Sequence, residues 1–325
     1  MRRFVLGALL GALVAGPALT LAARAWADGS EGTVLLRAEA VEGSVRLGDD
    51  VVVRVTVENG TREPVTVPDP RLAADALSLR VAADGARPSV VTRLYGEFVP
   101  DAGALRLAAT PTRGVVVPAG GRLTRDVRFA AVAPGALHVV AVLARGDGPA
   151  LTAPDFAVDV TTPGNVRRLT LRVETSREPF TVELDPAPDY ATVAHVWALA
   201  RDGFYTDLPF HRAVPGVLLQ TGDPRGDGTG TAGWYLPGEP AETPPTRGTV
   251  CLARGAHRDS GSSQWFVALA PDDVAATRLG GGFAPLGRVV EGLEAADALA
   301  STARESAAPR PSRPERVVRI RASVR

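Results

Sequence analysis

The feature that most constrains the fold is a series of short β-branched runs separated by turn residues. The run at residues 51–57, for example, follows Gly48-Asp49-Asp50 and is followed by Asn59-Gly60. Such runs suit strands, and Gly, Pro and Asn supply the turns between them. Because 34 Gly and 27 Pro punctuate the 325 residues, the sequence predicts a mainly β protein, long enough for two ordinary domains.

The composition excludes several classes of protein. Hydrophobic residues make up 45% and the formal net charge is zero, so the chain resembles neither a disordered polymer nor a nucleic-acid-binding protein. A single cysteine, Cys251, cannot form an intrachain disulfide or a cysteine-based zinc cluster. His195, His211 and His257 show no metal-ligand spacing, so we expect neither a metal nor a cofactor.

The amino terminus has the three parts of an export signal. Arg2-Arg3 precede an apolar run over residues 4–23, and Ala25-Trp26-Ala27 places small residues where a signal peptidase cleaves. We therefore predict a signal peptide, residues 1–27, removed before Asp28, and a periplasmic or extracellular protein with no membrane attachment after removal. The alternative is an uncleaved membrane anchor.

Residues 29–163 are expected to form an antiparallel β-sandwich. Asn59-Gly60 predicts a hairpin between the two runs that flank it. The pattern resembles that of bacterial immunoglobulin-like modules, and it contains no catalytic constellation. We expect this domain to place the protein or to contact an unknown envelope partner; the alternative is a spacer. The strand-like runs lie at residues 33–38, 51–57, 64–68, 77–81, 115–117, 123–129, 137–143 and 156–160.

The break at Thr161-Thr162-Pro163-Gly164 marks the boundary with a second domain, residues 166–325. Apolar residues at helical spacing between Val193 and Ala200 predict a helix that Gly203 ends, and residues 291–300 predict another. Roughly eight strands and two helices suit a closed antiparallel barrel capped by the helices. The predicted strands are residues 169–175, 179–184, 210–214, 217–220, 249–253, 264–269, 286–290 and 317–323.

Residues 210–224 combine a cation, an amide and apolar side chains, with no obvious nucleophile or base. That mixture suits a site that changes the conformation of a substrate without making or breaking a covalent bond. The glycine-rich residues 226–230 lack the ending of a phosphate-binding loop, so we expect a flexible surface loop there.

From residue 166 onward the chain resembles the cyclophilin-type peptidyl-prolyl cis-trans isomerases, of the bacterial kind. The resemblance implies an enzyme that acts on proline-containing polypeptides without a cofactor, here as a folding catalyst for exported proteins. It is carried by collinear motifs: Gly203-Phe204-Tyr205, Phe210-His211-Arg212, Pro215-Gly216, Gln220, Gly222-Asp223-Pro224, Gly228-Thr229-Gly230, Arg247-Gly248-Thr249, Leu252-Ala253-Arg254, Ser263-Gln264-Trp265-Phe266 and Gly287-Arg288-Val289-Val290-Glu291-Gly292.

The resemblance also assigns roles to residues. Arg212 would donate to the prolyl nitrogen, because its guanidinium stays charged and presents a rigid fork of donors. Gln220 would hold the substrate backbone or orient Arg212, and Phe266 would form the floor of the proline pocket. Gln264, beside Phe266 on the alternate side of the strand, would line the neighbouring groove. Further substrate-binding candidates are Phe210, the apolar walls Val217, Leu218, Leu279 and Phe283, and the peptide-pairing segment with Ala253 and Arg254.

Three departures from the family pattern affect the expected activity. Val217 stands where the family often has phenylalanine, Phe283 replaces a histidine or tyrosine, and Arg278 falls near the tryptophan important for cyclosporin binding. We expect a slow isomerase with weak cyclosporin sensitivity. The alternatives are a peptide-binding or chaperone module with little turnover, and a sandwich that acts as an adhesion or envelope-binding module with the barrel as accessory.

Overall fold

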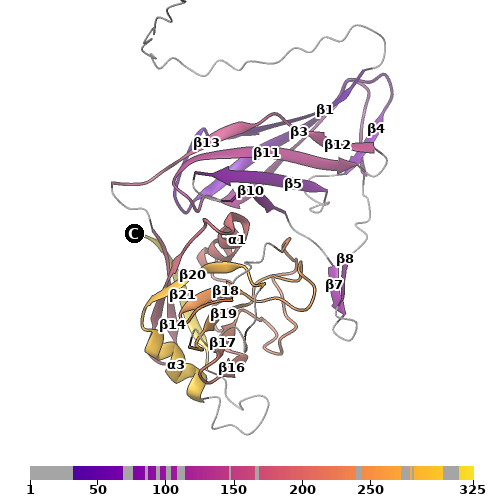
Figure 1. Cartoon of the computed structure of the whole chain (residues 1–325). Helices are drawn as coiled ribbons and strands as arrows, with labels where there is room; N and C mark the ends of the chain where they lie inside the picture. The colour runs from indigo at the N-terminus through magenta and orange to yellow at the C-terminus, as the bar shows by residue number, and fades with distance from the viewer. Residues whose placement is uncertain are drawn as a thin grey trace, which may run out of the picture. The chain divides into compact units, whose positions relative to one another are not determined.

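The computed structural model describes residues 32–68, 76–84, 87–92, 96–99, 104–107, 114–145, 148–164, 168–238, 244–271, 279, 282–302 and 315–325. The predicted signal peptide lies outside these residues. Strands dominate the described chain, as the sequence predicts (Figure 1). No helix in this part of the chain has both the length and the apolar character needed to cross a membrane.

The first half of the described chain forms two main sheets, of order β1-β3-β10 and β2-β13-β11-β5-β6. In β3 (Asp50–Asn59) every second residue from Val51 to Val57 is fully buried, as expected for a pleated strand with one face in the core. β1 contacts β11 and β13 of the other sheet. The remaining strands are β1 (Val34–Ala40), β2 (Ser44–Arg46), β4 (Val65–Pro68), β5 (Leu77–Ala83), β6 (Ser89–Val91), β7 (Gly96–Val99), β8 (Ala104–Leu107), β9 (Gly114–Val117), β10 (Arg122–Ala130), β11 (Gly135–Arg145), β12 (Gly148–Thr152) and β13 (Phe156–Thr161).

Two details differ from the predicted antiparallel sandwich. β2 pairs with β13 in parallel. The hairpin predicted at Asn59-Gly60 is also wrong, because β4 pairs with β9 whereas β3 lies between β1 and β10. The Asn59 side chain explains the redirection: its amide donates to the carbonyls of Glu63 and Val117, and its oxygen accepts from the backbone of Thr61. The asparagine thus fixes a wider turn rather than a two-residue hairpin.

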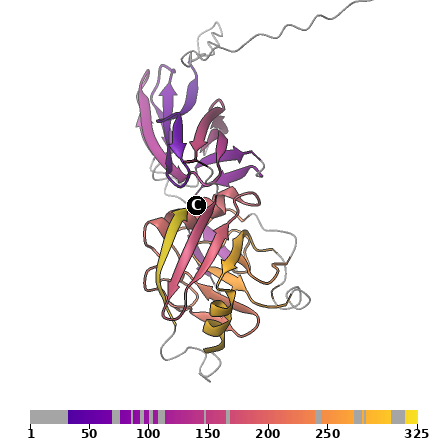
Figure 2. The same cartoon turned by 90° about the vertical axis from the view of Figure 1, so that its left-hand side faces the viewer.

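The second half forms one antiparallel sheet of order β16-β17-β19-β18-β20-β15-β14-β21. Its edge strand β21 is the yellow strand in Figure 2. β14 and β15 pair with each other in antiparallel orientation. The strands are β14 (Leu169–Thr175), β15 (Phe180–Leu184), β16 (Arg212–Val214), β17 (Leu218–Thr221), β18 (Thr249–Leu252), β19 (Trp265–Ala268), β20 (Pro285–Glu291) and β21 (Val317–Val324).

The closed barrel predicted for this domain is wrong, since the sheet is an open, curled half-barrel. Among the described residues its two edge strands do not pair, and one antiparallel bridge, Pro209 with Arg316, joins the segments before them. Beside this bridge the amide of Phe210 donates to Glu315 at 2.9 Å, and that of Val317 donates to Leu208 at 2.9 Å. In the antiparallel register of this bridge, residues after 209 lie opposite residues before 316, so β16 does not come opposite β21.

The two predicted helices are present as α1 (Tyr190–Arg201) and α3 (Leu293–Thr302). Asp189 caps α1 by accepting from the Thr192 amide at 3.0 Å, and Gly203, at φ +78°, follows its end in the left-handed conformation that the sequence predicts. α3 contacts β15, β16 and β17.

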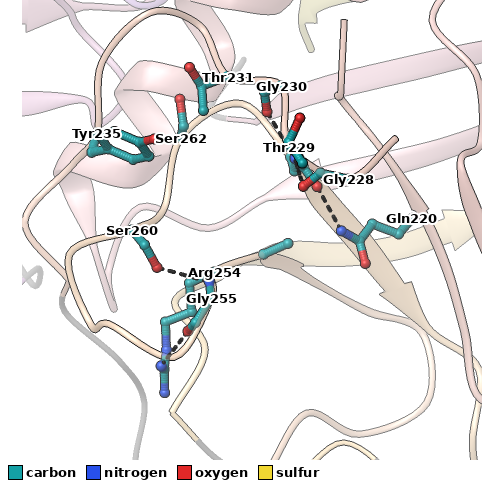
Figure 3. Close-up of a pocket in the computed structure, with 12 residues that line it drawn as sticks. Gln220, Gly228, Thr229, Gly230, Thr231, Tyr235, Arg254, Gly255, Ser260 and Ser262 are labelled. Atoms are coloured by element: carbon teal, nitrogen blue, oxygen red, sulfur yellow. Dashed lines mark hydrogen bonds between the residues drawn. The ribbon is translucent and has the colours of Figure 1, made fainter. Parts of the chain in front are cut away.

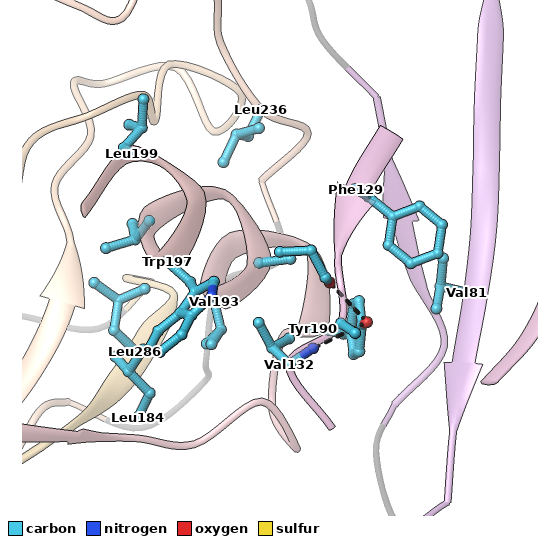
Figure 4. Close-up of a cluster of buried hydrophobic side chains, with 14 of the residues drawn as sticks. Val81, Phe129, Val132, Leu184, Tyr190, Val193, Trp197, Leu199, Leu236 and Leu286 are labelled. Carbon is cyan, nitrogen blue, oxygen red and sulfur yellow. Dashed lines mark hydrogen bonds between the residues drawn. The ribbon is translucent and has the colours of Figure 1, made fainter. Parts of the chain in front are cut away.

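Helix α1 also packs against the first two sheets, which the sequence did not predict. The Tyr190 hydroxyl donates to the Ala130 carbonyl at 2.9 Å and accepts from the Val132 amide (Figure 4). Trp197 Nε1 donates to the Gly48 carbonyl at 2.9 Å, and Arg201 pairs with Asp50 at 2.9 Å. These contacts help to make residues 32–325 one compact unit.

Candidate active site

Four strands bring the principal candidates into one row. The register pairs Arg212 in β16 with Gln220 in β17, Gln220 with Phe266 in β19, and Phe266 with Cys251 in β18. Directly paired residues in antiparallel strands project from the same face of the sheet. The residues between them, such as Leu219 and Val267, belong to the main core on the other face. Arg212, Gln220 and Phe266 therefore lie on the face opposite the core.

This face carries its own apolar group, which we call the outer cluster. Phe266 is 2% exposed and lies edge-on to Phe283, with ring centroids 5.0 Å apart and planes at 80°. The predicted floor and walls of the pocket are therefore neighbours in the structure. The outer cluster consists of the buried Leu218, Cys251, Phe266 and Ala268 with the partly buried Val214, Val217, Ala253, Leu279 and Phe283.

A glutamine pair borders the outer cluster. Gln220 Nε2 donates to Gln264 Oε1 at 2.9 Å, and Gln264 Nε2 donates to the carbonyls of Gly228 and Gly230 at 3.0 and 2.8 Å. Gln264 thus projects from the same face as Gln220 and Phe266, not from the alternate side that the sequence analysis gave it. It lines a groove of about 150 Å³. Gln220 and Arg254, which line the same groove, are labelled in Figure 3.

Two arginines stand beside the outer cluster. Arg212 is exposed, and its side chain makes no ion pair or hydrogen bond with the described residues. Arg254 is held in place: its Nε donates to the Gly282 carbonyl at 2.6 Å, and its guanidinium lies 5.6 Å from the centre of the Phe283 ring. Arg212 is therefore the site cation whose donors remain available to a substrate.

Burial shifts the pKa of two titratable groups near the row, Cys251 and His211. Burial raises the pKa of the Cys251 thiol to about 12, so the thiol stays protonated and unreactive at neutral pH. Burial also lowers the pKa of His211, against the opposing effect of Asp223. Among the described residues no group of three or more His, Cys, Asp or Glu side chains could hold a metal ion.

Some predicted residues are placed elsewhere. Phe210 is 3% exposed and packs in the main core, away from the outer cluster. Ala253 and Arg254, by contrast, line the groove as substrate-binding candidates, although the amides of Ala253 and Gly255 already donate to Gln264 O and Ser260 Oγ, both at 2.8 Å. Arg278 lies outside the described residues.

The glycine-rich loop, residues 226–230, has a part in the site that its sequence does not predict. It was predicted to be a flexible surface loop, yet its Gly228 and Gly230 carbonyls hold Gln264. The signal was Asp223 just before the loop, because a buried aspartate can organise several backbone amides. Thr229, Thr231, Tyr235, Ser260 and Ser262 also line the groove.

Comparisons with known proteins agree with this arrangement. Residues 170–322 match the family model described as cyclophilin type peptidyl-prolyl cis-trans isomerase/CLD. Peptidyl-prolyl cis-trans isomerase B of Bacillus subtilis is 39% identical over 114 residues, which cover 34% of this chain and 76% of the relative. A Synechococcus elongatus peptidyl-prolyl cis-trans isomerase is 44% identical over 80 residues, covering 25% of this chain and 54% of the relative. The chain belongs to the cyclophilin-type peptidyl-prolyl cis-trans isomerase family, and this membership supports isomerase activity.

Solved structures of a Cryptosporidium parvum cyclophilin are also similar. One has a TM-score of 0.41 at 23% identity and covers 48% of this chain and 98% of its own. A second, determined in the presence of the dipeptide Ala-Pro, has a TM-score of 0.40 at 22% identity and covers 46% and 96%.

Proposed function

We propose that the chain is a peptidyl-prolyl cis-trans isomerase that accelerates X-Pro rotation in exported polypeptides during their folding. The observation that carries the proposal is the row of Arg212, Gln220 and Phe266 on one face of the sheet. Uncatalysed X-Pro isomerisation takes tens to hundreds of seconds and can limit folding, so a catalyst of this step has a clear use.

The chemistry requires a donor and an apolar surface rather than a nucleophile. Rotation faces a barrier of about 18–20 kcal/mol because the amide nitrogen shares its lone pair with the carbonyl. In the twisted state that lone pair is localised, and the Arg212 guanidinium would donate to it. The outer cluster around Phe266 would hold the pyrrolidine ring, so that binding favours the twisted state over the planar one.

The cellular context is part of the proposal. The charged and apolar pattern of residues 1–27 supports export to the periplasm or the extracellular space. We further propose that the two-sheet amino-terminal domain is immunoglobulin-like and contacts a partner in the cell envelope. Its layered sheets and the lack of a second candidate site among its described residues favour a binding role over catalysis.

The test is a proline-peptide assay on the purified protein. Arg212→Ala should lower kcat/KM by about a hundredfold, the usual effect of removing one donor to a transition state. Arg321→Ala, which removes an exposed arginine paired with Glu174 on the far edge strand, is the matched control and should leave kcat/KM unchanged.

Two results would contradict isomerase activity: no acceleration by the wild type, or an unchanged rate in Arg212→Ala. Tight binding of a proline peptide without turnover would instead support the alternative of a peptide-binding or chaperone module. Weak inhibition by cyclosporin stays a prediction, since the position of Arg278 is outside the described residues.

A further inference from the structure

A buried carboxylate lies behind the glutamine pair. Asp223 is 0% exposed and follows β17 directly after Gly222. Its Oδ1 accepts from the Arg225 amide at 2.7 Å, and its Oδ2 accepts from the Gly228 amide. Gly230 packs so closely against the carboxylate that an added Cβ would lie 1.9 Å from Oδ1. Asp223 therefore fixes the path of the loop from residue 223 to 230.

The loop in turn fixes the orientation of one amide. The carbonyls of Gly228 and Gly230 both accept from Gln264, and a carbonyl oxygen can only accept. Gln264 must therefore direct its Nε2 to the loop, and this leaves its Oε1 to face Gln220. If the amide were reversed, Gln264 Oε1 would face the two carbonyl oxygens of Gly228 and Gly230.

The orientation is passed on to the second glutamine. Because Gln264 presents an acceptor, Gln220 must present its Nε2 to it, at 2.9 Å. The Oε1 of Gln220 then faces away from Gln264, and no described residue donates to it. Since Arg212 pairs with Gln220 across the strands, this free acceptor lies on the same face as the catalytic cation.

We propose that Asp223 is a positioning residue for the isomerase reaction. Through the loop and Gln264 it sets the polarity of the Gln220 amide, so that Gln220 presents an acceptor to the Arg212 guanidinium or to a substrate N–H. The inference rests on the proposed function, and it limits what Gln220 can bind with this oxygen, because an acceptor suits these two donors and not a substrate carbonyl.

The experiment is a double-mutant cycle in the full chain. Asp223→Asn retains size but places an NH₂ group against a backbone amide, so the loop loses one of its two bonds. We expect kcat/KM to fall about tenfold, the equivalent of about 1.4 kcal/mol of transition-state stabilisation. In a Gln220→Ala background the same substitution should change kcat/KM by less than about twofold, because the group it positions is absent.

A matched control separates positioning from folding. Asp189→Asn also alters a buried carboxylate that accepts a backbone amide, but at the cap of α1, away from the row. It should lower the midpoint of thermal unfolding and leave kcat/KM unchanged. If Asp223→Asn does not fold, Gln264→Glu provides the second test: it removes both donors to the loop carbonyls and should show the same loss and the same non-additivity with Gln220→Ala.

The outcomes are distinct. An active wild type in which Asp223→Asn and Gln220→Ala have independent, multiplicative effects would overturn this inference and leave the proposed function intact. A wild type with no isomerase activity would overturn both. The positioning role is supported if Asp223→Asn lowers kcat/KM in the wild type but not in the Gln220→Ala background, while Asp189→Asn leaves kcat/KM unchanged.

Discussion

Substitution of Tyr190 by phenylalanine tests whether the two halves of the chain act as one cooperative unit. Tyr190 is fully buried at the start of α1, and its ring lies edge-on to Phe129 at 6.2 Å. Its hydroxyl donates to Ala130 O and accepts from Val132 N, both in the amino-terminal half. Burial raises the pKa of this hydroxyl, so it remains a neutral donor throughout the physiological range.

The expected cost follows from these partners. Tyr190→Phe keeps the ring contact but leaves a buried carbonyl and a buried amide without the hydroxyl, and an unmade buried bond costs about 1–3 kcal/mol. We take about 2 kcal/mol, which lowers the midpoint of thermal unfolding by about 3 °C for a cooperative unit that spans residues 32–325. Because the lost bonds join the two halves, the transition should also broaden.

Differential scanning calorimetry measures both effects, and Tyr205→Phe is the control. Tyr205 is as deeply buried, but its hydroxyl donates to Ser263 O at 3.2 Å inside the second domain. Its loss should lower the midpoint while the ratio of calorimetric to van't Hoff enthalpy stays the same. If Tyr190→Phe leaves both midpoint and width unchanged, the contact does not couple the halves.

Three further predictions concern the site. The lowered pKa of His211 means that the folded protein favours the neutral imidazole, so the free energy of unfolding should decrease as pH falls below about 6.5, by at most about 1.4 kcal/mol per pH unit. His211→Gln should flatten this part of a plot of unfolding free energy against pH. Phe266→Ala should cost about 3 kcal/mol in denaturant unfolding and reduce turnover at least about tenfold, whereas unchanged turnover would show that the ring does not hold the substrate. Gly222→Ala should lower the free energy of unfolding by about 2–3 kcal/mol, because its φ is +92° and an added Cβ would lie 2.2 Å from a carbonyl oxygen. Gly216→Ala is the control: its φ is +66° but the space around it is open, so the loss should be about 1 kcal/mol.

Much of the site could be predicted because strand alternation determines which side chains share a face. Gln220 and Leu218 are two residues apart in β17, and so both project away from the core while Leu219 projects into it. The same alternation should have placed Gln264 on the face of Phe266, two residues away. It does not apply to Phe210, because the backbone between Phe210 and β16 is irregular, and so Phe210 and Arg212 lie on different faces although they are two residues apart.

What could not be predicted depends on partners distant in sequence. Helical spacing shows that Trp197 and its neighbours are buried but not that Gly48 accepts from the indole 149 residues away. Similarly, Asn59-Gly60 is a strong local hairpin signal, but it was overridden by bonds from Asn59 to carbonyls near residue 117. Local propensity is a weak prior where a side chain satisfies distant backbone groups.

The isolation of Arg212 favours a functional explanation over a structural one. An exposed ion pair contributes at most about 1 kcal/mol, so an arginine without a partner costs the fold little and adds little to it. Its neighbours in the site are different: Gln220 and Gln264 are tied to each other and to the loop, and Arg254 is tied to Gly282. Within the described part of the chain, a fixed amide network and a fixed apolar floor thus lie beside a guanidinium without a partner, a preorganised arrangement that suits the ring and the acceptor of the proposed X-Pro substrate.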